Sequence, residues 1–184
     1  MQLDMRELVI DSIRISQMNY QRVVVLKELE TNLFLLIWIG PTEAEAIAVK
    51  MQGMTVPRPL THDLLVDLVK SVGGSFEHIL VNDLQNETFY AKVVIRVGDQ
   101  THEIDSRPSD AMAVAVRAEV PIYVADEVMD KAAISMDQDT GQPLTPESAA
   151  TEDAEANVTE EELQKLSAFT DLINELDMED FERK

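Results

Sequence analysis

The fold is decided where a strand turns into a helix, at Ile104-Asp105-Ser106-Arg107-Pro108-Ser109-Asp110-Ala111-Met112-Ala113-Val114-Ala115-Val116-Arg117. Ahead of this stretch, residues 90–105 alternate between apolar and polar side chains, which is typical of strands. Pro108 suits the first position of a helix, where its missing N–H leaves no hydrogen bond unmade. The helix that follows is small and apolar on nearly all sides, so we expect it to be buried between other layers.

The junction gathers polar side chains at the start of this buried helix. We expect Ser106 or Arg107 just before the helix, with Ser109 and Asp110 in its first turn. Asp110 is favoured there by the positive end of the helix dipole. Strand-to-helix junctions often hold functional sites, because exposed amides and charged side chains converge on a rigid support. The sequence therefore directs attention to Asp105, Arg107, Ser109 and Asp110.

The first 135 residues predict an α+β domain. Three strands over 7–16, 22–28 and 33–39 can form an antiparallel meander, and imperfect alternation in the first indicates a β-bulge. Further strands are expected over 76–83, 88–97, 101–105 and 122–124, and further helices over 42–52, 61–72 and 126–133. We expect a mixed, largely antiparallel sheet with a buried central helix and other helices packed on it.

Composition excludes several classes of chemistry. The 184 residues include no cysteine, so disulfides, thiolate zinc sites and a cysteine nucleophile are excluded. The net charge of −20 repels nucleic acids and anionic membranes at long range. The N-terminus lacks the long apolar segment of a secretory signal. The longest apolar run, 33–39, is far below the roughly 18 residues of a spanning helix, so we expect a cytoplasmic protein without membrane contact.

The C-terminal part differs from the domain in composition. Residues 136–158 are rich in acidic and small polar side chains and predict a flexible acidic linker. Residues 159–184 predict an acidic helical tail: Thr159 and Glu162 fit a capping box, and apolar residues recur at helical spacing as far as about 176. From Asp137 onward there are 15 acidic and 3 basic residues, a net charge of −12.

The apolar stripe of the segment 159–176 needs a partner. The domain itself, a second copy of the chain and another protein all fit this role. An apolar sheet also leaves edges to be covered. From these two features we expect a homodimer, with a protein partner for residues 159–176 as a further possibility.

Several stretches together resemble the bifunctional nuclease domain family, formerly a domain of unknown function. They are Ile37-Trp38-Ile39-Gly40 followed by Glu43 and Ala44; Arg58-Pro59-Leu60-Thr61-His62-Asp63-Leu64-Leu65; Asp83-Leu84 with Thr88-Phe89-Tyr90-Ala91; Ile104 to Ala111; and Pro121-Ile122-Tyr123-Val124. The resemblance covers the domain up to residue 135 and not the tail. It implies a compact α+β domain with a mixed sheet and an activity on both RNA and DNA. The candidate roles of individual residues rest on their chemistry and not on the resemblance.

Cleavage of a phosphodiester bond needs an activated nucleophile, stabilisation of charge on the phosphate and help for the leaving oxygen. Nucleases often meet these needs with divalent metal ions held by carboxylates. Asp83 ends a predicted strand, and Asp105 and Asp110 flank the central junction. If these places converge, the three carboxylates are candidate ligands of Mg²⁺ or Mn²⁺.

The remaining candidates supply proton transfer and phosphate contacts. His62 is the candidate general base or acid at a helix start, with Asp63 beside it. Arg107 is the candidate phosphate clamp, because its guanidinium can bind two phosphate oxygens at once. Arg58 and Ser109 complete the expected substrate-binding set. The expected catalytic set is His62, Asp63, Asp105, Arg107 and Asp110.

Each candidate also has a structural interpretation that the sequence leaves open. The residues at helix starts can be surface or dipole partners, the carboxylate before a turn can stabilise that turn, and Arg107 can form an ion pair with Asp105 or Asp63. In that case the chain is a non-catalytic regulatory or interaction domain. Three carboxylates within ligating reach in an open cleft favour the enzyme. The same groups buried and paired with Arg58 and Arg107 favour the interaction domain.

Overall fold

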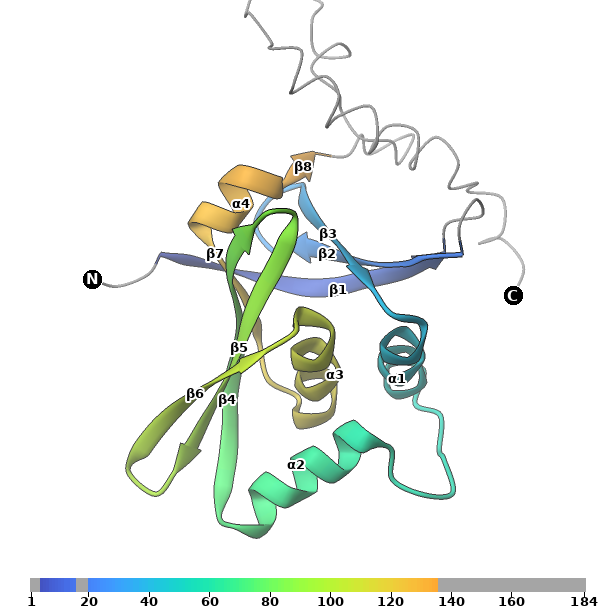
Figure 1. Ribbon diagram of the computed structural model, residues 1–184, viewed down its shortest axis with the longest axis vertical. Helices are drawn as coiled ribbons and strands as arrows, with labels where there is room; N and C mark the ends of the chain where they lie inside the picture. The colour runs from blue at the N-terminus through green and yellow to red at the C-terminus, as the bar shows by residue number, and fades with distance from the viewer. Residues whose placement is uncertain (1–3, 16–19, 136–184) are drawn as a thin grey trace, which may run out of the picture.

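The computed structural model describes residues 4–15 and 20–135. Its elements follow the order β1 (Met5–Ile15), β2 (Arg22–Glu28), β3 (Leu33–Ile39), α1 (Pro41–Met51), α2 (Thr61–Ser71), β4 (Gly74–Gln85), β5 (Thr88–Val97), β6 (Gln100–Ser106), α3 (Pro108–Ala118), β7 (Ile122–Ala125), α4 (Asp126–Ala132) and β8 (Ile134–Ser135) (Figure 1). The linker expected over 136–158 and the helical tail expected over 159–184 lie outside the described residues and stay predictions.

One eight-stranded sheet joins two antiparallel meanders. The strand order is β6-β5-β4-β7-β1-β2-β3-β8, so the short strand β7 lies between β4 of one meander and β1 of the other. Among the described strands, β4 and β7 run parallel and every other neighbouring pair is antiparallel. The register of β1 on β2 shifts between Ile10 and Ser12, which confirms the expected bulge. The prediction of a mixed, largely antiparallel α+β fold is confirmed.

The strand β8 was not predicted from the sequence. Its two residues pair with Leu33 and Phe34 of β3. A two-residue strand is too short to show the period-2 alternation on which strand prediction depends. Ile134 and Ser135 therefore form the edge strand of the sheet, directly before the predicted linker begins.

The central helix α3 is buried, as its composition predicts. Ala111, Met112, Ala113 and Val114 are all inaccessible to solvent. They belong to the main core together with the inward-facing side chains of β4 and β5. Figure 1 shows α3 between the long β4–β5 pair and α1, with α2 crossing near one end. In the described part of the chain no helix has the length and apolar character needed to cross a membrane.

Candidate functional site

Three helices begin around one polar cluster, and each carries a carboxylate at its third position. These carboxylates are Glu43 of α1, Asp63 of α2 and Asp110 of α3. Pro41 and Pro108 open α1 and α3, with preset backbone angles that suit a first turn. A negative charge in the first turn is stabilised by the helix dipole. The preference for an acid in the first turn places one carboxylate at the start of each helix. Because α1 and α2 both pack against α3, the three carboxylates lie near the central helix.

Arg107 links two of these carboxylates. Its Nε donates to Asp110 Oδ2 at 2.6 Å, and its Nη2 donates to Glu43 Oε1 at 2.8 Å and to Asp110 Oδ1 at 3.1 Å. The Arg107 side chain is 67% exposed, whereas that of Glu43 is 17% exposed. The hydrogen bonds that Arg107 donates to Asp110 and Glu43 raise the pKa of its guanidinium further, so it is always charged. This arrangement holds a cation at the solvent-facing edge of the cluster.

His62 reaches Asp110 from the start of α2. Its Nε2 lies 3.1 Å from Asp110 Oδ1, and its side chain is 12% exposed. Burial raises the pKa of Asp110, but hydrogen bonds from Arg107 and His62, with their charges, outweigh burial and leave that pKa below its usual value. Since an ionised carboxylate only accepts hydrogen bonds, His62 Nε2 carries the proton in this contact. The lone pair of a neutral His62 ring is then on Nδ1.

Asp63 lies in a separate ion pair, on the neighbouring face of α2. Its Oδ1 accepts from Arg117 Nε at 2.6 Å, and its Oδ2 accepts from the backbone N–H of Leu60 at 2.7 Å. The Arg117 side chain is 4% exposed and also donates to the carbonyl of Ala113. Burial raises the pKa of Asp63, but the Leu60 N–H and Arg117 outweigh it and lower that pKa. This geometry ties the start of α2 to the end of α3.

Other predicted site residues lie apart from this cluster or are covered. Asp83, at the end of β4, accepts from the N–H of Leu84 and from the Gln85 side chain, which fits the turn role. Asp105 is exposed on β6, and Arg58 is exposed on the connection before α2. Ser109 is buried at 6% exposure. Asp110, Arg107 and His62 are thus the predicted residues that the fold brings together.

The predicted metal ligands do not form a common set of donors. Both oxygens of Asp83 are engaged near its own turn, and both oxygens of Asp110 accept from Arg107 or His62. Within residues 4–15 and 20–135, no three His, Asp or Glu side chains lie so that they could hold a metal ion together. The arrangement does not fit a ready-made centre for Mg²⁺ or Mn²⁺, and we derive no chemical step through a metal.

Sequence reasoning missed Glu43 and Arg117 as members of these networks. A signal for Glu43 was present: Pro41-Thr42-Glu43 repeats the proline, hydroxyl, acid order of Pro108-Ser109-Asp110. Arg117 follows Asp110 by seven residues, which places both on one side of α3. Neither spacing identifies a partner on another helix, and that information exists only in the packing.

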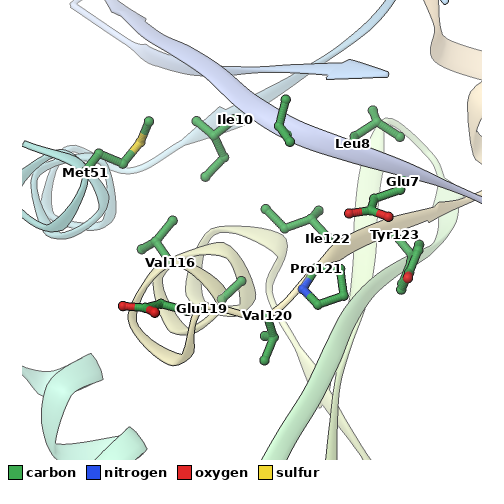
Figure 2. A pocket seen from close by; sticks show the side chains of 12 residues that line it. Glu7, Leu8, Ile10, Met51, Val116, Glu119, Val120, Pro121, Ile122 and Tyr123 are labelled. Carbon is green, nitrogen blue, oxygen red and sulfur yellow. The ribbon is translucent and has the colours of Figure 1, made fainter. Parts of the chain in front are cut away.

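A cavity elsewhere in the domain is chemically different from the polar cluster. It has a volume of about 530 Å³ and lies between β1, the end of α3 and β7. Figure 2 shows Ile10, Val116 and Ile122 around it, with Met51 of α1 at one side. Its ionisable lining residues are Glu7, Glu119 and Tyr123. With an apolar wall and no cation, it does not suit a phosphate group.

Comparison with known proteins shows the family of this domain. The family model for the bifunctional nuclease domain matches residues 24–137. This chain belongs to the bifunctional nuclease domain family. The match contains Glu43, His62, Arg107 and Asp110, so the whole polar cluster lies inside the family domain.

Relatives of the bifunctional nuclease domain found by comparison fall into two groups. An uncharacterized protein of Mycobacterium tuberculosis (strain H37Rv) is 38% identical over 170 residues, covering 92% of this chain and 96% of that protein. Bifunctional nuclease 2 of Arabidopsis thaliana is 29% identical over 108 residues, covering 57% of this chain and 33% of that protein. Bifunctional nuclease 1 of Oryza sativa subsp. japonica is 23% identical over the same fractions. The plant proteins named as nucleases therefore share the domain and not the full architecture.

Proposed function

We propose that this protein is a phosphodiester hydrolase of low sequence specificity that acts on RNA and DNA. The observation that carries the proposal is the His62–Asp110 contact of 3.1 Å beside the exposed guanidinium of Arg107. A histidine oriented by a carboxylate, next to a cation, is the combination that acyl and phosphoryl transfer sites use for proton transfer and charge stabilisation. Membership of the bifunctional nuclease domain family supports the same substrate class.

His62 acts as the general base in this proposal. Asp110 fixes the Nε2–H tautomer and orients the ring, so Nδ1 is free to take a proton from the attacking water. For RNA the ribose 2′-hydroxyl is an alternative nucleophile that Nδ1 can deprotonate. The new P–O bond forms as the ester P–O bond breaks. The protonated ring then returns its proton to the departing oxygen.

Arg107 stabilises the negative charge that builds on the phosphate. Its Nε and Nη2 are held by Asp110 and Glu43, which fixes the plane of the guanidinium. Its Nη1 has no hydrogen-bond partner among the described residues. A preorganised donor of this kind needs no rearrangement when the charge develops, which makes it effective in catalysis. Contacts to the backbone phosphate carry no base information, which fits low sequence specificity.

The test is a cleavage assay with the full-length protein on labelled single-stranded RNA and DNA. The variants are His62→Ala and Arg107→Ala, with His102→Ala as a matched control, because His102 is an exposed histidine on β6 outside the cluster. We expect His62→Ala to lower the rate by about 10²–10⁴-fold, the usual contribution of a general base. The control should cleave at the wild-type rate.

Parallel reactions with Mg²⁺, Mn²⁺ or EDTA test the expected divalent metal separately. Activity that persists in EDTA and is lost in His62→Ala supports the proposed chemistry. Activity that EDTA abolishes and His62→Ala leaves intact contradicts it. Equal cleavage by wild type and both cluster variants would identify a contaminating nuclease. Tryptophan emission from Trp38 checks that each variant is folded.

A non-catalytic interaction domain is the second candidate, and two observations favour it. Among the described residues, no three carboxylates lie within reach of one metal ion, and Asp110 is paired with Arg107. Helix α2 buries Val66 but leaves Leu64 and Leu68 exposed, and Val72 directly after the helix is exposed as well, all three between 57% and 64%. These residues lie at four-residue spacing, so they form a continuous apolar stripe. Exposed stripes of this kind are typical of protein contact surfaces. If no nucleic acid is cleaved under any metal condition, this stripe is the first surface to mutate in a binding study.

A further inference from the structure

The sheet has a second apolar face, separate from the main core. Along β2 and β3, residues Val24 and Leu35 point into the main core, so their neighbours point to the opposite side of the sheet. There Val23, Val25, Phe34 and Leu36, each at most 8% exposed, form a buried cluster of their own, with Ile134 of β8 packed against it. Among the described residues this outer cluster contains no helical residue. We call it the outer face.

The outer face is flanked by cations. Cross-strand pairs place Arg14 beside Val23, and Lys27 beside Val9 and Phe34. The Lys27 ammonium lies 5.7 Å from the centre of the Phe34 ring. Neither Arg14 nor Lys27 forms an ion pair with another described residue. Three neighbouring cross-strand rows of the outer face therefore combine apolar side chains with two positive charges.

We propose that the acidic segment 159–176 of the same chain docks on the outer face. Its predicted apolar stripe of Leu163, Leu166, Phe169, Leu172 and Ile173 matches the outer cluster in chemistry. The segment itself contains five acidic residues and one basic residue, a net charge of −4, opposite to that of the flanking cations. The described chain ends with β8, which itself contacts the outer cluster.

Chain length allows this contact within one molecule. The 23 residues of 136–158 join β8 to the docking segment. A flexible chain of that length spans about 25 Å on average, from roughly 5–6 Å times the square root of the residue number. That span is comparable to the length of a strand of the sheet. The segment can therefore reach the face beside which its own linker begins.

The chain contains its own reporter for the docked state. Trp38 is the only tryptophan, lies opposite Val23 on the outer face and is 39% exposed. The double variant Leu166→Asp/Phe169→Asp places charges on the apolar stripe of the full chain. Gln164→Asp is the matched control, because it adds a negative charge on the opposite side of the predicted helix. We expect the double variant to shift Trp38 emission to longer wavelength and to increase its quenching by acrylamide, with no change for the control.

A second pair of variants tests the charge component. Lys27→Glu should produce the same red shift as the double variant, whereas Lys70→Glu, an exposed reversal on α2, should not. The wild-type emission should not change on dilution, because the contact lies within one chain. Emission that is identical in wild type and the double variant overturns the proposal. A red shift that appears on dilution of wild type also overturns it and assigns the outer face to a second copy.

Discussion

Removing the Asp63 carboxylate should destabilise the domain strongly, because it leaves Arg117 charged, buried and unpaired. Arg117 is 4% exposed, and breaking a buried ion pair from one side costs about 3–5 kcal/mol. Asp63 is 30% exposed, so water can partly replace it and reduces that cost. The variant Asp63→Ala also loses the acceptor for the Leu60 N–H, a capping contact of about 1 kcal/mol. Together these terms predict a loss of about 2–4 kcal/mol.

Urea unfolding followed by Trp38 fluorescence measures this loss. With a slope of about 2 kcal/mol per molar urea, the midpoint should fall by roughly 1–2 M. Asp67→Ala, an exposed acid one turn further along α2, should stay within about 0.5 kcal/mol of wild type. The double variant Asp63→Ala/Arg117→Met should recover much of the loss, because it removes the unpaired charge. A single variant as stable as the control, or no recovery in the double variant, would refute the assignment of a structural ion pair.

Two further predictions concern the Arg107 cluster. The pKa of Asp110 is lower in the folded chain than its ordinary 3.8, so its ionised form contributes stability above that pH, and this contribution disappears as pH falls through the lower folded value. The difference in free energy of unfolding between wild type and Asp110→Asn should therefore be largest at pH 5 to 6 and should decrease below pH 3.8. Urea unfolding measured across this pH range tests it. Gly40 has an ordinary extended backbone, but a Cβ there would run into the Glu43 carboxylate. Gly40→Ala should lower cleavage as much as Glu43→Gln does while leaving the urea midpoint nearly unchanged, and wild-type activity in Gly40→Ala would contradict a role for Glu43.

The strands and helices of the domain could be predicted from sequence because their signals are local. The alternation of residues 88–97 places β5 at its observed bounds, and Pro108 marks the start of α3. Burial of α3 followed from its composition, since Ala111 and its neighbours offer no polar face. The parallel pairing of β7 with β4 had no local signal. It depends on how α3 returns the chain to the centre of the sheet.

The sequence predicted the contacts of the candidate site only where the two residues lie close together in the chain. Arg107 and Asp110 are three residues apart, and both were expected in one cluster. The partners that decide their roles are distant: Glu43 lies 64 residues from Arg107, and His62 lies 48 from Asp110. Asp63, expected beside His62 in the catalytic set, lies on the neighbouring face of α2, because successive residues of an α-helix point about 100° apart. Adjacent residues thus belong to different networks.

This division between adjacent residues explains how one helix start can serve both stability and chemistry. The Asp63–Arg117 pair holds the start of α2 against α3 with nearly complete burial of the arginine. That attachment restricts the backbone at His62, whose Nε2 meets Asp110, and no hydrogen bond of Nδ1 to another described residue is present. The buried pair restricts the position of the ring, which is itself only 12% exposed, whereas the Arg107 guanidinium beside it faces solvent. The 67% exposed cation adds little to stability, because exposed ion pairs contribute about 0–1 kcal/mol.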